Sequence, residues 1–132
     1  MPLNPADVRA MAERYATAWS SRSPDAVASF FEEDGRISIN DGEPIVGRAA
    51  IAEMAKGFYS EFPDLVVHLD DIRAAGHNAL FVWTLEGKHS ETGKTVKVGG
   101  WEEWTLSDNV LISASRGRFD AAEYDRQVAE GV

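Results

Sequence analysis

The sequence predicts an α+β fold in which three N-terminal helices pack on a curved, mostly antiparallel sheet. Two patterns support this prediction. Apolar residues recur at helical spacing over much of the first half of the chain, and they alternate with polar residues between short turns in the second half. Helices that precede a run of strands are typical of α+β domains. With 132 residues, the chain is long enough to bury one core, so we expect a single domain over residues 1–132.

Two helices are expected at the N-terminus. Asn4 can cap the first helix, Pro5 suits its first turn, and the helix is expected to end around residues 20–22. Its buried stripe would consist of Val8, Met11, Ala12, Tyr15 and Trp19. Ser23 begins a second, shorter helix, which residues 32–35 are expected to end. The inward side chains of this second helix would be Val27, Phe30 and Phe31.

A short strand and a third helix are expected next. Residues 36–40 alternate as a strand, and residues 40–44 have the composition of a turn. Gly47 opens the third helix, and Pro63 stops it. The apolar stripe of this helix would consist of Ile51, Met54, Ala55, Phe58 and Phe62.

Four strands and a last short helix complete the chain. The strands are expected at residues 65–75, 79–90, 95–107 and 110–119, joined by short turns as in an antiparallel meander. The spacing of Asp120 and Glu123 is that of a capping box, which begins the last helix. Helices on one face of such a sheet leave a cone-shaped hollow, and the other face must be solvated or paired with another chain. We expect a homodimer through that outer sheet face.

The amino-acid composition argues against several classes of binding partner and indicates a cellular compartment. The net charge of −9 argues against nucleic acid as a partner, because phosphate binding requires a basic patch. The absence of cysteine excludes disulfides and thiolate metal sites. No signal peptide and no apolar run of membrane-spanning length is recognisable, so we expect a cytoplasmic protein without membrane association. We expect no cofactor and no metal, because neither a glycine-rich phosphate loop nor a metal-binding spacing of histidines occurs.

Residues 98–106 form the strand with the clearest indication of chemistry. Alternation places Glu102 on one face with Trp104, and Glu103 on the other face. If the first face is interior, the Glu102 carboxyl must be paired, hydrogen-bonded or protonated, because an isolated buried charge is costly. An apolar wall would raise its pKa and suit a general acid or base. The alternative is a structural salt bridge to an arginine such as Arg116 or Arg36.

Tyr15 and His89 are two further candidates for a catalytic role. The Tyr15 hydroxyl could donate a hydrogen bond to a substrate oxygen, or Tyr15 could be a core residue with its hydroxyl at the rim. His89 shares a strand face with Trp83 and would point into the hollow near its mouth. It could act there as a general base, or it could be an edge histidine beside a turn.

Aromatic side chains are expected to line the hollow. A wall of tryptophans with one or two acids is what an apolar, ring-bearing small molecule would require. Arg116 and Arg118 flank Gly117 near the end of the last strand, and we expect one of them to face inward and balance Glu102. The predicted lining residues are Trp19, Tyr59, Phe62, Trp83, Trp104 and Arg116.

Seven short segments carry a resemblance to a known family. They are Tyr15–Trp19, Ser23–Asp25, Phe31–Gly35, Gly47–Ile51, Phe62–Leu65, Trp83–His89 and Phe119–Asp120. Their order resembles the SnoaL-like branch of the nuclear transport factor 2-like superfamily over nearly the whole chain. The resemblance implies a cystatin-like α+β barrel with a cone-shaped pocket. This superfamily includes isomerases, cyclases, epoxide hydrolases, ring-hydroxylase subunits and non-enzymatic modules, so the function must be argued from the site.

Two groups within this superfamily suggest roles for the candidate residues. Ketosteroid isomerases are similar, and the resemblance places Tyr15 at their oxyanion tyrosine and Glu102 at their oxyanion aspartate. The position of their general-base aspartate reads Ile39 here, or Asn40 or Asp41 if the strand is shifted. SnoaL-type polyketide cyclases use a histidine and an aspartate, for which His89 and Glu102 are the nearest counterparts.

A third group, the limonene epoxide hydrolases, is also similar, but Gly100 and Gly117 replace two of the three residues that it requires. We therefore expect a cofactor-free enzyme of the isomerase or cyclase type that acts on an apolar cyclic or polyketide-like carbonyl compound. Glu102 or His89 would be the acid or base, and Tyr15 would stabilise an enolate-like oxygen. The alternatives are a non-catalytic small-molecule binding protein and a dimerisation module of the same fold.

Overall fold

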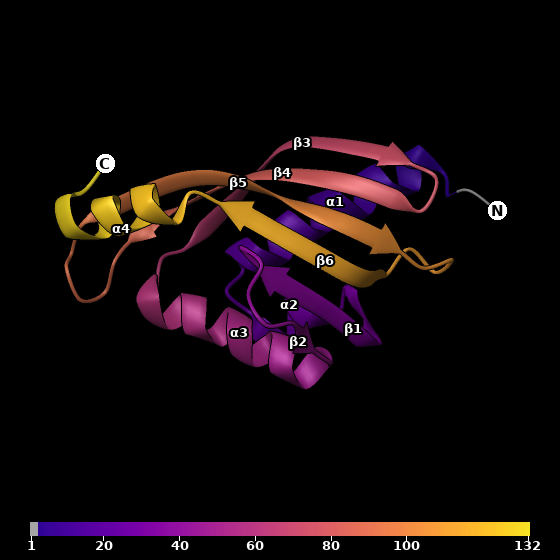
Figure 1. The fold of residues 1–132 in the computed structure, drawn as a ribbon, viewed down its shortest axis with the longest axis horizontal. Coiled ribbons are helices and arrows are strands. Elements are labelled where there is room, and N and C mark those ends of the chain that lie inside the picture. The colour runs from indigo at the N-terminus through magenta and orange to yellow at the C-terminus, as the bar shows by residue number, and fades with distance from the viewer. Residues whose placement is uncertain (1–2) are drawn as a thin grey trace.

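The computed structural model describes residues 3–132 and confirms the α+β fold (Figure 1). The helices are α1 (Pro5–Ser20), α2 (Pro24–Ala28), α3 (Arg48–Glu61) and α4 (Ala121–Glu130). The strands are β1 (Phe31–Ile39), β2 (Ile45–Val46), β3 (Val66–Ala75), β4 (Asn78–Lys88), β5 (Thr95–Leu106) and β6 (Ile112–Phe119).

All six strands form one curved sheet in the order β2-β1-β6-β5-β4-β3. Strands β3 to β6 make the predicted antiparallel meander. Strand β1 pairs parallel with β6, so the first long strand lies beside the last one. Helix α1 packs on β3, α3 packs on β1 and α2, and α4 packs on β5, as can be followed in Figure 1. The helices and the sheet thereby surround a common interior.

Three of the four predicted helix starts, those of α1, α2 and α4, are confirmed by side-chain caps. The Asn4 carboxamide oxygen accepts a hydrogen bond from the Ala6 amide at 2.9 Å, and Asp120 accepts one from the Glu123 amide at 3.1 Å. Ser23 caps α2 in the same way. These caps satisfy amides that the first helical turn leaves without an intrahelical acceptor.

Two segments differ from the sequence prediction. Residues 32–35 do not end α2 but belong to β1, where their pairing with β6 is interrupted between Phe31 and Arg36. A Cβ atom on Gly35 would lie 2.8 Å from the Ile112 carbonyl oxygen, so this irregular stretch depends on glycine. Strand β2, which follows the predicted turn, was not predicted, because two residues are too few to show alternation.

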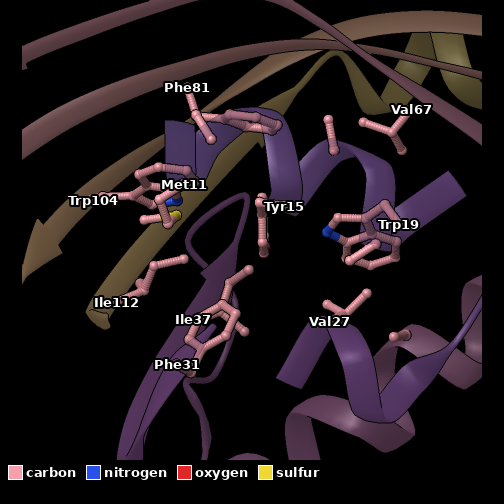
Figure 2. Close-up of a cluster of buried hydrophobic side chains, with 14 of the residues drawn as sticks. Met11, Tyr15, Trp19, Val27, Phe31, Ile37, Val67, Phe81, Trp104 and Ile112 are labelled. Atoms are coloured by element: carbon pink, nitrogen blue, oxygen red, sulfur yellow. The ribbon is translucent and has the colours of Figure 1, made fainter. Parts of the chain in front are cut away.

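A cluster of aromatic side chains fills the interior between α1 and the sheet (Figure 2). The Tyr15 ring lies edge-on to both Phe81 and Trp104, with ring centroids 5.3 Å apart in each case. Phe81 and Trp104 stack on each other at 5.0 Å. All three side chains are buried, and offset or perpendicular ring contacts of this kind add to the stabilisation from burial.

Strand β5 separates the interior from the outer face. Its even-numbered residues from Val96 to Leu106 are buried, so the face shared by Glu102 and Trp104 is the inner one. Trp101 points outward and is 42% exposed. The homodimer expected through this outer face stays a prediction. None of the helices within residues 3–132 has the length and apolar character needed to cross a membrane.

Candidate active site

The Glu102 carboxylate is the centre of the candidate site. Its side chain is 7% exposed and accepts hydrogen bonds from three side chains. Ser115 donates to Oε1 at 2.7 Å, and Trp104 Nε1 donates to the same oxygen at 3.0 Å. The Tyr15 hydroxyl lies 3.1 Å from Oε1 and 3.2 Å from Oε2. Among residues 3–132, three donors contact Oε1, whereas Oε2 has only the shared contact with Tyr15.

Three elements place these donors around one carboxylate. Trp104 lies two residues after Glu102 on β5 and therefore on the same face. Ser115 is the cross-strand partner of Trp104 on β6, which sets it diagonally beside Glu102. Tyr15 lies on the buried stripe of α1, and its hydroxyl contacts the Glu102 carboxylate. Hydrogen-bonded groups of this kind hold a buried carboxylate in one orientation.

Burial raises the pKa of the Glu102 carboxyl above its usual value, and the hydrogen bonds from Trp104, Ser115 and Tyr15 act in the opposite direction. Burial and the nearby Glu102 carboxyl raise the pKa of Tyr15 well above its usual range, so the Tyr15 hydroxyl stays protonated and donates. No Lys, Arg or His within residues 3–132 forms a salt bridge with Glu102. The group is thus a buried acid without a cationic partner, a feature that is common at functional sites.

A cavity of about 70 Å³ lies on the inner side of the sheet, and Glu102 is part of its wall. Six aromatic residues form much of the remaining wall, namely Trp19, Phe58, Phe81, Trp83, Phe119 and Tyr124. Glu102 is the only carboxylate that lines this cavity within the described part of the chain. This volume is about half that of a cavity of roughly 150 Å³ that binds benzene in another protein. A ligand the size of benzene or larger therefore requires the walls to move apart.

Ile39, which the resemblance placed at the position of the ketosteroid isomerase base, is apolar and lines the cavity. The two following residues are engaged elsewhere. Asn40 accepts a hydrogen bond from the Phe119 amide, and Asp41 pairs with Arg118 at 2.6 Å. A second carboxylate therefore does not reach Glu102 from this strand.

Two of the predicted lining residues, Trp19 and Trp83, line the cavity. Trp104, Tyr59 and Phe62 are not among its lining residues. Trp104 is instead a hydrogen-bond donor to Glu102, and the Tyr59 hydroxyl donates to the Trp19 carbonyl oxygen at 2.9 Å. Phe62 is completely buried.

The prediction that Arg116 faces inward is wrong. Arg116 lies on the outer face, where its guanidinium donates to Glu103 at 2.7 Å. Alternation along β6 puts Ser115 and Gly117 on the inner face and Arg116 on the other one. The structural salt bridge considered for Glu102 is therefore absent within residues 3–132, and Ser115, which the sequence reasoning missed, takes the inner position that the arginine was expected to fill.

His89 lies at the turn between β4 and β5. Its Nδ1 atom accepts from the Glu91 and Thr92 amides at 3.3 and 3.4 Å, and its Nε2 atom lies 3.6 Å from a Glu61 carboxylate oxygen. Its ring packs edge-on against Phe62 at 5.4 Å. These contacts match the alternative of an edge histidine that organises a turn.

His89 is also far from Glu102 along the sheet. It follows Lys88, whose cross-strand partner is Thr95, and Glu102 lies seven residues further along β5. At about 3.3 Å per residue this separation is on the order of 23 Å. The structure thus brings Tyr15 and Glu102 together but not His89. Within residues 3–132, no three His, Asp or Glu side chains are arranged so that they could hold a metal ion.

Tyr15→Phe is expected to raise the pKa of Glu102 further, because it removes a hydrogen bond to the carboxylate. It should also lower the free energy of unfolding by about 1 kcal/mol. Carbon NMR titration of the Glu102 carboxyl measures the pKa. Tyr59→Phe is the matched control, because the Tyr59 hydroxyl contacts the Trp19 carbonyl and not Glu102. An unchanged pKa in Tyr15→Phe would contradict the role of Tyr15 in holding the carboxylate.

A family model described as a SnoaL-like domain matches residues 12–114. No curated protein matches the chain. Among solved structures, a hypothetical protein with a ketosteroid isomerase-like fold from Catenulispora acidiphila, in complex with trimethylamine, has a TM-score of 0.83 and 16% identity, covering 89% of this chain and 91% of that one.

Two further solved structures share the fold. A protein described as a SnoaL-like polyketide cyclase from Jannaschia sp. CCS1 has a TM-score of 0.85 and 14% identity, covering 100% of this chain and 99% of that one. SalBIII is described as an epoxide hydrolase/cyclase-like enzyme with a role in pyran ring formation in polyether salinomycin. It has a TM-score of 0.81 and 16% identity, covering 91% of this chain and 95% of that one.

Proposed function

Because the chain belongs to the SnoaL-like domain family, we propose that it is a cofactor-free enzyme that moves protons on an apolar cyclic or polyketide-like carbonyl compound. The observation that carries this proposal is Glu102, a buried carboxyl with a raised pKa in the wall of an otherwise apolar cavity. A carboxyl of raised pKa is a better base than an exposed one and can return the proton at a pH near neutrality.

In this proposal the Oε2 atom of Glu102 removes a proton from the carbon beside the carbonyl group. The electron pair of the broken C–H bond moves toward the carbonyl oxygen and gives an enolate-like intermediate. Glu102 then returns the proton to a different carbon of an isomerase substrate. In a cyclase the enolate carbon bonds to the carbon of a second carbonyl group of the same substrate, the electron pair of that C=O bond moves onto its oxygen, and this oxygen takes the proton from Glu102. Tyr15 acts as a positioning residue, since its proton is directed at Glu102.

Relatives of the same fold support this class of reaction. The Jannaschia protein is described as a polyketide cyclase, and SalBIII is described as acting in pyran ring formation. Their identities to this chain are 14% and 16%, so they support the kind of chemistry and not a particular substrate. The apolar wall and the Glu102 carboxyl favour an apolar substrate with one polar group.

The test is proton exchange at the α-carbon of small cyclic ketones such as cyclohexanone, followed by proton NMR in D₂O. The protein is expected to accelerate the exchange, and Glu102→Gln is expected to reduce the acceleration by about 10²- to 10⁴-fold, the usual contribution of a general base. Glu103→Gln is the matched control, because Glu103 lies next to Glu102 but on the outer face, bonded to Arg116. Equal exchange by both variants would remove Glu102 from the mechanism.

A second candidate function is the binding of a small organic ammonium ion without turnover. One observation favours it: the carboxylate has no cationic partner within residues 3–132, and aromatic rings surround the cavity beside it. Aromatic faces attract ammonium groups, and the Catenulispora protein of this fold is described in complex with trimethylamine. Saturable binding of trimethylammonium by the wild type, weakened in Glu102→Gln and combined with no ketone exchange, would favour this candidate over the first.

A further inference from the structure

Gly117 lies on the inner face of β6, in the part of the sheet that forms the cavity wall. It pairs with Glu102 of β5 on one side and with Ile39 of β1 on the other side. Phe81 of β4 is the next partner of Glu102, so the four residues form one row across four neighbouring strands. All four line the cavity. The row has a gap at Gly117, because glycine places no side chain between Glu102 and Ile39.

The gap above Gly117 is one carbon atom wide across the strands. A Cβ atom added there would lie 3.9 Å from Cγ of Glu102 and 3.9 Å from Cγ1 of Ile39. The nearest other atom within residues 3–132 is the Ser38 carbonyl oxygen, at 3.7 Å. Two carbon atoms in contact lie about 3.5–4.0 Å apart. One layer of carbon therefore touches both flanking side chains, and a second layer does not fit between them.

The gap is longer along β6 than across it. The neighbouring inner-face residues of β6 are Ser115 and Phe119, two positions away in either direction. At about 3.3 Å per residue, their Cα atoms are on the order of 13 Å apart. We call the space bounded by Glu102, Ile39, Ser115 and Phe119 the Gly117 slot. Its narrow, elongated shape fits the edge of a flat group whose plane runs along the strand.

The fold does not require glycine at position 117. The residue lies within β6 and is not among the glycines of positive φ. Gly35 and Gly100 differ, because a Cβ atom would lie 2.8 Å from the Ile112 carbonyl oxygen in the first case and 2.5 Å from Cζ2 of Trp83 in the second. At Gly117 an added Cβ makes only ordinary contacts. The space above Gly117 is thus available to a ligand and is not used by the packing of the protein itself.

The Gly117 slot is the part of the cavity that stays fixed when the cavity opens. A ring-bearing ligand requires some wall to move, because the cavity is smaller than one that holds benzene. Strands β1, β6 and β5 lie side by side, and their ladder of hydrogen bonds sets the spacing between them (Figure 1). The helices contribute the lining residues Trp19, Met54, Phe58 and Tyr124. These side chains can move without breaking the ladder, so the slot keeps its width.

We propose that Gly117 is a specificity-determining residue, and that the slot above it selects ketones with a flat ring over ketones with a puckered ring. The inference rests on the proposed function and names its substrate class, a ketone on or within a planar, conjugated ring. Such a ring is one layer of carbon atoms and enters the slot. A saturated ring has carbon atoms above and below its mean plane and stays outside the slot. A ring in the slot lies with one face against the Glu102 side chain.

The test compares two methyl ketones with the same number of non-hydrogen atoms. Acetophenone has a flat ring, and cyclohexyl methyl ketone has a puckered one. Chemical-shift titration of ¹⁵N-labelled protein measures both dissociation constants. We expect the wild type to bind acetophenone about tenfold more tightly, because a second layer of atoms would overpack the slot. Nuclear Overhauser contacts between the acetophenone ring protons and the Gly117 Hα protons should place the ring in the slot.

Gly117→Ala is expected to remove this preference, because its methyl group occupies the slot. Acetophenone should bind about tenfold more weakly, and cyclohexyl methyl ketone should stay within about twofold of its wild-type affinity. The variant should fold as the wild type does, since its Cβ makes ordinary contacts, and circular dichroism checks this. Gly99→Ala is the matched control, because it adds the same methyl group on the adjacent strand but on the outer face, and it should keep the preference.

Two results would overturn the proposal. One is equal binding of the two ketones by the wild type, a measurement that does not depend on the folding of any variant. The other is a Gly117→Ala variant that binds both ketones more weakly by the same factor, which would mean that the methyl group only reduces the cavity volume. The proposed reaction is tested separately by α-proton exchange. A binding preference without exchange would remove the reaction and keep the slot, whereas exchange with equal binding would remove only the slot.

Discussion

Gly100→Ala is expected to lower the free energy of unfolding by about 3 kcal/mol, the upper part of the usual range for overpacking. A Cβ atom at this position would clash with the Arg118 carbonyl oxygen and would lie 2.5 Å from Cζ2 of the Trp83 ring. The oxygen belongs to the backbone of β6, which pairs with β5 at this point and cannot move without breaking the ladder. Urea denaturation monitored by circular dichroism measures the effect.

Gly99→Ala is the matched control for this prediction. Gly99 is the preceding residue on the same strand, but it faces outward, and a Cβ atom there would lie 3.5 Å from its nearest neighbour, an ordinary contact. We expect its stability to stay within about 0.5 kcal/mol of the wild type. Equal destabilisation by the two substitutions would mean that glycine is required for backbone freedom and not for the close approach of Trp83.

The stability of the wild type relative to Glu102→Gln is expected to fall as the pH rises. The pKa of Glu102 is raised in the folded protein, so between the unfolded and folded pKa values the folded state binds more protons than the unfolded state. The contribution of the protonated carboxyl is complete below the unfolded pKa and is lost as the pH passes through the folded pKa. The expected loss is about 1.4 kcal/mol for each unit by which folding raises the pKa.

Denaturation of both proteins at a series of pH values measures this difference. Every other titratable group is common to the two proteins, so subtracting one stability from the other leaves the contribution of Glu102. We expect the difference to become constant again above the folded pKa. A difference that grows with pH would mean that the hydrogen bonds from Ser115, Trp104 and Tyr15 outweigh the effect of burial.

The sequence predicted those features that depend on local pattern. The spacing of apolar residues gave the stripe of α1, and the buried residues of that helix include all five of the predicted ones. The capping residues Asn4, Ser23 and Asp120 mark the starts of three helices, because a cap depends only on its own first turn. Alternation in residues 98–106 separated Glu102 from Glu103 correctly by face.

Features that depend on pairing between distant segments could not be predicted from the sequence. Residues 32–35 look like the polar end of a helix, but their pairing with a strand near the C-terminus makes them part of β1. The role of Ser115 was not predicted, because it depends on the register between β5 and β6, which places the Ser115 hydroxyl beside Glu102. Arg116 was predicted to be the charge partner of Glu102. Alternation along β6 instead places Arg116 on the outer face, where it pairs with Glu103.

The parallel pairing of β1 with β6 has a consequence for the order of events during synthesis. Phe31 lies beside Ile112, so β1 emerges from the ribosome about 80 residues before its main partner exists. Until then β1 can pair only with the two-residue strand β2, and its other edge stays open to other chains. Contacts between such distant residues slow folding, because a long loop must close before they form. The cavity, which has walls from both β1 and β6, therefore takes shape only after nearly the entire chain has been made.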